Sequence, residues 1–294
     1  MFLKNLTLHN FRNYETKTFE FHPGFNIILG LNGRGKTNLL EALFYLSYLQ
    51  SFRTTKRVDL LKKDSNEGFV KSVLEKDNVT HELMVILETQ GRSVKLNGKK
   101  PDGKFFGLLP VLLFEPRDVY LFRETPSERR RFINRAVFLN EPKTIVLFRE
   151  YEKVLQHKNK LLKDGNFGEM ADLLPLWNEK LASLGAQIVI YRQKWISEMN
   201  ALLEEEYKNV SGKNEKMKLS LSGFSDMSDR SDLSDMSEKL LASMAARKDE
   251  EIRRRESLVG PHRDDWGGLI HNKAIGTFAS QGENRSAVIA LKSA

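Results

Sequence analysis

The chain has 294 residues, 40% of them hydrophobic and 29% charged, which is enough to bury a large core in one or two domains. It holds 47 lysines and arginines against 39 aspartates and glutamates, and the resulting charge of +8 favours a polyanionic partner without identifying it. Cysteine is absent, which excludes cysteine-ligated metal sites, and no apolar run approaches the ~20 residues of a membrane span, so we expect a cytoplasmic protein with no membrane contact.

The first third of the chain has the pattern of several strands around one helix. Apolar residues in alternation or in short runs predict strands around Leu6 and Leu8, around Phe19 and Phe21, and over residues 25–29, 69–74, 82–88 and 93–96. The segment from Asn38 to Gln50 is crowded with apolar side chains, which predicts a helix buried on most sides.

Beyond Pro126 the apolar residues recur at steps of three and four, which predicts helices. One such stripe runs from Trp177 to Leu202, and residues 163–172 are the expected reversal between two antiparallel helices. Strand-like pieces are expected again over residues 269–279, followed by a helix from about Asn284.

A low-complexity repeat of serine and aspartate occupies residues 225–237. Its composition predicts a mobile acidic surface loop. A second interpretation is an acidic segment that mimics DNA and lies over a basic groove. Either interpretation places a boundary at the repeat.

The strongest motif is GLNGRGKT at residues 30–37, which fits G-x-x-x-x-G-K-[ST] between a predicted strand and a predicted helix. Glycines let backbone amides surround a phosphate, and the helix N-terminus adds a partial positive charge. We expect Lys36 to neutralise the β- and γ-phosphates of ATP and the Thr37 hydroxyl to ligate Mg²⁺. The predicted nucleotide-binding residues here are Gly30, Leu31, Asn32, Gly33, Arg34, Gly35, Lys36, Thr37 and Asn38.

A second motif, FASQGE at residues 278–283, precedes the last predicted helix and resembles the signature sequence of ABC-type ATPases. In those proteins a serine hydroxyl and a glycine amide bind the γ-phosphate held by the opposite subunit. By this resemblance Ser280, Gln281 and Gly282 are further nucleotide-binding residues. Taken alone, the same residues fit an ordinary helix start with a serine cap.

Together with these motifs, several short segments resemble the RecF family of SMC-like ATPases in the same order along the chain. They are NFRNY at 10–14, LEA at 40–42, SFRT at 51–54, FEPRD at 114–118, PSERRRF at 126–132, GPHRDD at 260–265 and FASQG at 278–282. The resemblance implies an α/β fold: a P-loop ABC/SMC-like ATPase head with an inserted antiparallel α-helical arm. We therefore expect the head in residues 1–120 and 211–294 and the arm in residues 121–210.

The resemblance also implies what the protein does. It implies an ATP-binding, DNA-binding repair protein that forms an ATP-dependent homodimer on single-stranded or gapped DNA. It further implies partnership with RecR and RecO, RecA loading, DNA replication and the SOS response. DNA contacts would come from basic surface such as residues 129–131 and 253–255, since no helix-turn-helix or zinc-finger pattern is present.

One expected part of an ABC-type ATPase has no match in this sequence. The apolar strand that ends in an acid pair, called Walker B, and the switch histidine do not follow the signature before Ala294. The hypothesis is a truncated chain that binds ATP weakly and hydrolyses it poorly, so no catalytic residue is assigned and enzymatic activity stays open.

Other functions fit parts of the sequence. A P-loop also occurs in small-molecule phosphotransferases, although a long helical hairpin fits that class poorly. A nucleotide-binding scaffold without DNA activity is a further alternative. His262, Asp264 and Asp265 suggest a metal or hydrolase centre, but two carboxylates and one histidine make a sparse ligand set.

Overall fold

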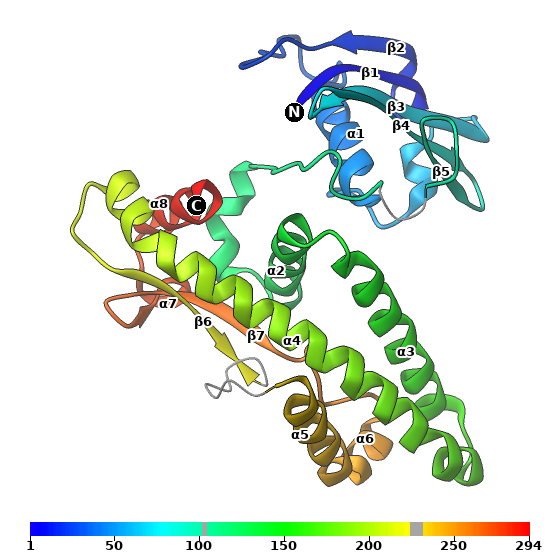
Figure 1. Cartoon of the computed structure of the whole chain (residues 1–294), viewed down its shortest axis with the longest axis vertical. Coiled ribbons are helices and arrows are strands. Elements are labelled where there is room, and N and C mark those ends of the chain that lie inside the picture. Colours follow the sequence, from blue (N-terminus) through cyan, green and yellow to red (C-terminus); the bar gives the residue numbers. More distant parts are fainter. Residues whose placement is uncertain (102–104, 224–231) are drawn as a thin grey trace. The chain divides into compact units, whose positions relative to one another are not determined.

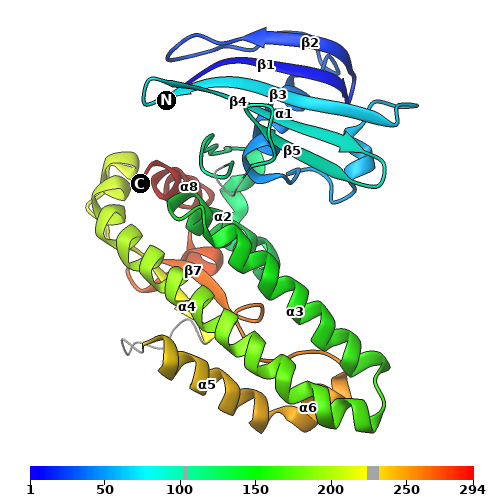
Figure 2. The same ribbon diagram turned by 45° about the vertical axis from the view of Figure 1, so that its right-hand side comes forward.

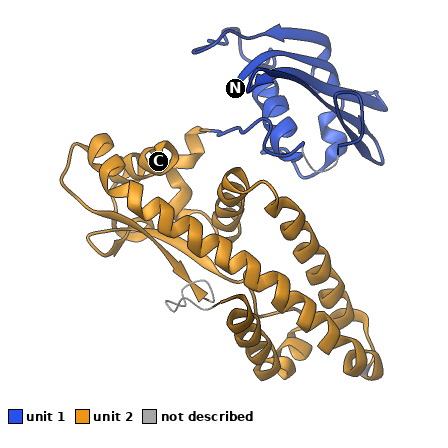
Figure 3. Ribbon diagram, in the orientation of Figure 1, with its two compact units in different colours: residues 1–113 blue, residues 114–294 orange. Residues whose placement is uncertain are grey.

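The computed structural model describes residues 1–101, 105–223 and 232–294. They form two compact units, Met1–Leu113 and Phe114–Ala294, coloured separately in Figure 3. Most of the predicted acidic loop, residues 225–231, lies outside the described residues. The end of the repeat belongs to a helix, because Asp232 caps the helix that starts at Leu233.

The first unit contains an antiparallel sheet of five strands in the order β2-β1-β3-β4-β5 (Figures 1 and 2). The strands are β1 (Phe2–Phe11), β2 (Tyr14–Glu20), β3 (Glu67–Lys76), β4 (Val79–Glu88) and β5 (Arg92–Leu96). Hydrophobic residues alternate along these strands, so one face of the sheet is apolar. The strands predicted around Leu6, around Phe19 and over 69–74, 82–88 and 93–96 are confirmed.

Helix α1 (Lys36–Tyr48) packs against the apolar face of this sheet. Leu39 and Leu46 of the helix belong to the same buried cluster as Leu8, Val70 and Val85 of the strands. The predicted buried helix is therefore confirmed, although it starts at Lys36, two residues before the predicted Asn38. A short 3₁₀ helix, η1 (Arg57–Leu60), follows it.

The strand predicted over residues 25–29 is wrong. These residues have no regular secondary structure, and the side chains of Phe25, Ile27 and Leu29 are 102%, 81% and 86% exposed. A strand is stable only beside a partner that accepts and donates its backbone hydrogen bonds. No described strand pairs with this segment, so its apolar run alone does not fix a strand.

The second unit is built on a helical hairpin. Helix α3 (Thr144–Asp164) runs antiparallel to the long helix α4 (Phe167–Ser211), as predicted (Figure 1). The reversal is shorter than the predicted residues 163–172, because only Gly165 and Asn166 lie between the helices. Asn166 begins α4 with a capping box, in which its side chain and that of Glu169 each accept a backbone amide proton.

Shorter elements make up the rest of the second unit. They are η2 (Pro116–Arg123), α2 (Pro126–Asn140), β6 (Met217–Ser222), α5 (Leu233–Ala246), α6 (Lys248–Arg254), β7 (Asp265–Ile270), β8 (Lys273–Ala274), α7 (Ile275–Phe278) and α8 (Gln281–Ser293). The strands form a three-stranded sheet in the order β6-β7-β8. The strand pattern predicted up to residue 279 is wrong beyond Ala274, where the chain turns into α7. The last helix begins at Gln281, before the predicted Asn284.

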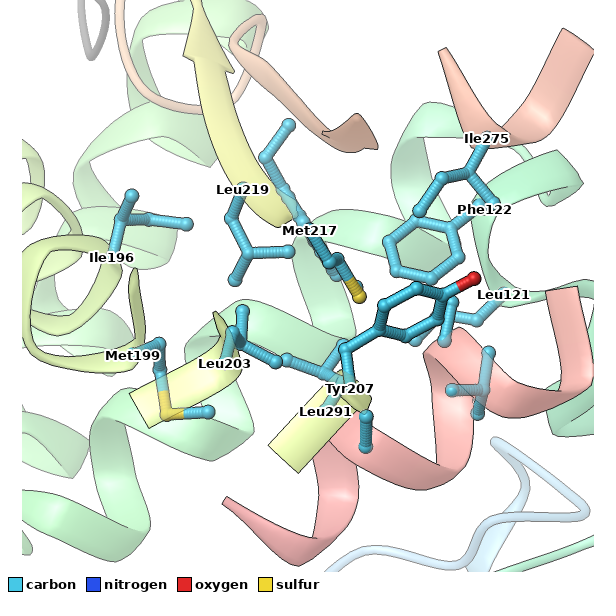
Figure 4. Packing of buried hydrophobic residues seen from close by; sticks show 14 of the residues in the cluster. Leu121, Phe122, Ile196, Met199, Leu203, Tyr207, Met217, Leu219, Ile275 and Leu291 are labelled. Carbon is cyan, nitrogen blue, oxygen red and sulfur yellow. The ribbon is translucent and has the colours of Figure 1, made fainter. Parts of the chain in front are cut away.

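The core of this unit joins segments from its whole length. Figure 4 shows Met217 and Leu219 of β6 beside Leu203 of α4, and Leu291 of α8 and Phe122 of η2 belong to the same buried cluster. Because α8 packs on both α4 and η2, its N-terminus has a fixed place in this unit. Within the described residues, no helix is both long and apolar enough to cross a membrane.

Candidate nucleotide-binding site

The glycine-rich loop leads into α1 in the conformation that its glycines permit. Gly30, Gly33 and Gly35 have φ angles of 155°, 78° and 99°, which side chains disfavour. A Cβ atom on Gly35 would lie 2.7 Å from Asn13 Oδ1 and 2.7 Å from the Tyr14 hydroxyl. Glycine is thus required at position 35 both for its backbone angle and for this close approach.

The first turn of α1 presents positive charge to the loop. Lys36 Nζ donates hydrogen bonds to the carbonyl oxygens of Gly30 (2.6 Å) and Leu31 (2.9 Å), so the ammonium group lies against the loop. No described side chain caps this helix end, and its first turn holds no acidic residue. Free amides, the helix dipole and an ammonium group therefore converge at one point, which is the arrangement that binds phosphate.

The other predicted nucleotide-binding residues of the loop differ in what surrounds them. Residues 30–34 and Thr37 are exposed, so their backbone and hydroxyl groups are accessible. Asn38 is held by the protein itself: its Nδ2 donates to Asn13 Oδ1 (2.8 Å), and its Oδ1 accepts from Arg53 (2.7 Å). The hydroxyl of Thr37 is a hard oxygen ligand of the kind that Mg²⁺ prefers.

A buried carboxylate fixes the elements around the loop. Glu41 of α1 is fully buried, and both of its oxygens accept from Arg12, at 2.9 Å from Nε and 2.6 Å from Nη2. It also accepts from the Ser51 hydroxyl and, at 3.2 Å, from Arg53. Glu41 thereby joins three segments that are far apart in the sequence: NFRNY, LEA and SFRT.

The sequence does not predict this network as a functional unit. The three segments were noted only for their resemblance to the RecF family, and no role was assigned to Glu41, Arg12 or Arg53. One signal is available in the sequence: Glu41 is a charged residue with apolar neighbours on both sides in the middle of the helix. Such a residue needs a buried partner of opposite charge, but the sequence does not say which arginine supplies it.

The signature segment begins α8 in the second unit. Ser280 is the N-cap residue, and its Oγ accepts from the Glu283 amide at 3.2 Å. Glu283 in turn accepts from the Ser280 amide (2.9 Å) and hydroxyl (3.0 Å) and pairs with Lys213 (3.1 Å). The hydrogen bond from the Ser280 backbone, together with Lys213, holds the pKa of Glu283 below its ordinary value. Gln281 and Gly282 are exposed at this helix end.

Two further side chains hold Ala279, which precedes Ser280 within the signature. Arg123 of η2 donates to the Ala279 carbonyl at 2.6 Å. Asn284 Nδ2 donates to the carbonyls of Ala279 (3.3 Å) and Ser280 (3.2 Å). Neither residue was singled out from the sequence, since a single arginine or asparagine carries no recognisable pattern.

The GPHRDD segment, residues 260–265, contacts three helices of the second unit. His262 Nδ1 lies 2.6 Å from the Tyr151 hydroxyl of α3, and burial lowers the pKa of His262 to about 4. The Asp264 carboxylate lies 4.0 Å from Arg192 of α4, and Asp265 pairs with Arg129 of α2. The ring of His262 packs between α3 and the loop. Both carboxylates are engaged by arginines, which accounts for them without a metal ion.

Several of the basic residues considered for DNA contacts have partners within the protein. Arg129 binds Asp265, and Arg130 donates to the Asp264 carbonyl at 2.9 Å. Arg131 is 61% exposed beside Glu128, and residues 253–255 are exposed at the end of α6. The exposed arginines of α2 and α6 therefore remain the candidates for phosphate contacts.

Comparisons with known proteins agree with this geometry. Residues 2–104 match the family model described as the RecF/RecN/SMC N terminal domain. The chain is 35% identical to the DNA replication and repair protein RecF of Geotalea daltonii and 34% identical to that of Geobacillus thermodenitrificans. These matches cover 100% and 99% of this chain and 80% of each relative.

Solved structures show the same likeness in three dimensions. A structure of the recombination mediator protein RecF with ATPrS in the RecFOR pathway has a TM-score of 0.91 and 30% identity, over 99% of this chain and 79% of the other. A structure of RecF with ATP has a TM-score of 0.88 and 29% identity, over 99% and 80%.

The fold and the site define an ABC-type, SMC-like ATPase of the α/β class, with a P-loop and an antiparallel helical arm. This confirms the predicted fold class. The sequence identity is 30% or more, and each match covers at least 79% of the relative's own length. The chain therefore belongs to the RecF family.

Proposed function

We propose that the chain binds ATP with Mg²⁺ on residues 30–37 and acts in recombinational DNA repair. The observation that carries the proposal is the uncapped N-terminus of α1, where free amides meet Lys36 Nζ. The glycine conformations shape the loop, and a Cβ on Gly35 would collide with the side chains of Asn13 and Tyr14. Lys36 would neutralise the terminal phosphates, and Thr37 would ligate Mg²⁺ together with phosphate oxygens. The solved RecF structures with ATP and ATPrS support the choice of nucleotide.

The second part of the proposal is a shared site. Residues 280–282 of one copy would bind the γ-phosphate of the ATP held by the P-loop of another copy. The support is the exposure of Gln281 and Gly282 at the N-terminus of a well-packed helix. Because such a site is complete only in a dimer, ATP would stabilise the homodimer by binding to it preferentially.

The third part concerns DNA. We place the protein on single-stranded or gapped DNA, with RecR and RecO as partners, in RecA loading, DNA replication and the SOS response. The names of the relatives and the RecFOR pathway to which the solved RecF structures belong support this assignment. The net charge of +8 and the exposed arginines of α2 and α6 suit contacts with phosphates rather than bases. In this proposal residues 1–120 and 211–294 make one cytoplasmic ATPase head and residues 121–210 its arm.

A binding titration tests the proposal. The full chain would be added to a fluorescent gapped duplex with and without Mg-ATP, and Lys36→Ala would be the control. We expect ATP to tighten binding by about tenfold or more in the wild type and to have no effect in Lys36→Ala. DNA affinity that does not depend on ATP would contradict ATP-gated binding.

A further inference from the structure

The first turn of the signature helix α8 already holds a negative charge. Glu283 Oε2 accepts from the backbone amide of Ser280 at 2.9 Å and from its hydroxyl at 3.0 Å. The hydrogen bond from this amide, together with Lys213, holds the pKa of Glu283 below its ordinary value, so the carboxylate is ionised at neutral pH. A helix N-terminus favours an anion, and here a side chain of the protein supplies it.

The Ser280 hydroxyl is the group for which this carboxylate and a phosphate would compete. A hydroxyl carries one proton and therefore donates one hydrogen bond. Its oxygen accepts from the Glu283 amide at 3.2 Å, and its proton has Glu283 Oε2 as an acceptor. A phosphate oxygen can take this proton only if the carboxylate gives it up. Two acceptors that both lie about 3 Å from one oxygen are at most roughly 6 Å apart, a distance at which two negative charges repel each other.

A lysine from a distant segment binds the other oxygen of the carboxylate. Lys213 follows α4 in the connection to β6, and its Nζ lies 3.1 Å from Glu283 Oε1. Helices α4 and α8 pack together, which holds this connection beside the first turn of α8 (Figure 1). The Lys213 side chain is 51% exposed, and its Nζ also lies 3.7 Å from Glu215. Lys213 thus offsets the charge of Glu283, while residues 280–282 stay exposed.

From these contacts we propose that Glu283 and Lys213 set, with opposite effects, the affinity of the signature for the γ-phosphate held by a second copy. The inference rests on the proposed function, because this phosphate belongs to the shared site. Glu283 accepts the Ser280 proton when no phosphate does, and its charge opposes the phosphate. Lys213 offsets that charge and remains a partner for the carboxylate once the hydroxyl donates to the phosphate. Both are positioning residues that act through Ser280.

Two neutral variants separate this role from a structural one. Glu283→Gln keeps the capping box, since a glutamine side chain also accepts from the Ser280 amide, but it removes the charge. The dissociation constant of its ATP-bound dimer should fall by about threefold. Lys213→Gln leaves the carboxylate without its cation, so the dissociation constant should rise by about threefold. Sedimentation of the full chain at saturating Mg-ATP measures both values.

Lys216→Gln is the matched control. It removes the same charge from the same connection, but the partner of Lys216 is Glu204 of α4, so this variant should dimerise like the wild type. Affinity of the monomer for ATP should be equal in all these proteins, because the P-loop is unchanged. A purely structural ion pair would shift Glu283→Gln and Lys213→Gln in the same direction. That result, or no shift in either variant, would overturn this inference alone. A wild-type chain that stays monomeric with ATP would overturn the proposed function and this inference with it.

Discussion

The two loops proposed to bind phosphate are stabilised in different ways. The P-loop has no side-chain cap of its own, and the elements around it are held by Glu41, which joins residues from three separate segments. The signature segment has a cap of its own, because Ser280 and Glu283 cap each other within one turn, and Arg123 and Lys213 add support from outside it. The P-loop therefore leaves its amides free for a ligand, whereas the signature helix keeps its shape through neighbouring residues.

Because of this difference, we expect substitutions in the two loops to lower stability by different amounts. A change in the Glu41 network should spread to every segment that it joins, because the charge of Arg12 loses its buried partner. A change in the capping box should stay within the first turn of α8. We therefore expect the loss of stability to be largest at Glu41 and smallest at the cap.

Replacing the buried carboxylate should have the largest effect. Glu41→Gln keeps the size of the side chain but removes the charge that binds Arg12, so the free energy of unfolding should fall by about 3–5 kcal/mol. Urea denaturation of the full chain measures it. The control is Glu75→Gln, which removes an exposed pair with Lys4 in the sheet that α1 packs against. Its free energy of unfolding should change little. Equal stabilities of the two variants would contradict the role of Glu41.

The second prediction concerns acid and the second unit. The pKa of His262 is lowered from 6.5 to about 4 in the folded chain, so the unfolded chain binds the extra proton between these values. Stability is thus complete above about pH 6.5 and falls as the pH decreases towards 4, by about 3 kcal/mol in total.

Denaturation curves at several pH values measure this contribution, as the difference in pH dependence of stability between the wild type and a His262 variant. His262→Gln should lose less stability than the wild type between pH 6.5 and 4.5. His271→Gln, at a histidine that is 62% exposed, should follow the wild type. If His262→Gln also follows the wild type, the buried neutral state of His262 is refuted.

The smallest effect is expected at the signature cap. Ser280→Ala removes the acceptor for the Glu283 amide, which should lower the free energy of unfolding by about 1 kcal/mol in the absence of nucleotide. Ser293→Ala, at the other end of α8, is the control and should be close to neutral. A loss as large as that of Glu41→Gln would show that the two loops do not differ in the way described.

The sequence predicted the elements whose stability depends on local pattern. The glycine spacing located the P-loop, and the three-and-four spacing from Trp177 to Leu202 located α4. The run over residues 25–29 was mistaken for a strand, because pattern alone does not reveal whether a pairing partner exists. The apolar pattern up to Ala279 also wrongly predicted strand beyond Ala274. The chain forms α7 there, which packs on η2, an element far away in the sequence.

Within the candidate site, the sequence identified the residues that are proposed to contact the nucleotide but not those that support them. Lys36 and Ser280 belong to recognisable motifs. Glu41 and Arg123 act through partners distant in the sequence, and only the fold brings those partners together. The burial of His262 is not evident from the sequence, because it depends on Tyr151 of α3, more than a hundred residues earlier.

The most direct test of the central claim is a mixing experiment. Lys36→Ala removes the P-loop lysine from one preparation, and Ser280→Arg blocks the signature in another. Neither should dimerise with Mg-ATP alone, but a mixture of both should form dimers, because one shared site then has an intact P-loop from one copy and an intact signature from the other. Sedimentation velocity measures this. If the wild type dimerises with ATP but the mixture remains monomeric, the two loops do not share a nucleotide between copies.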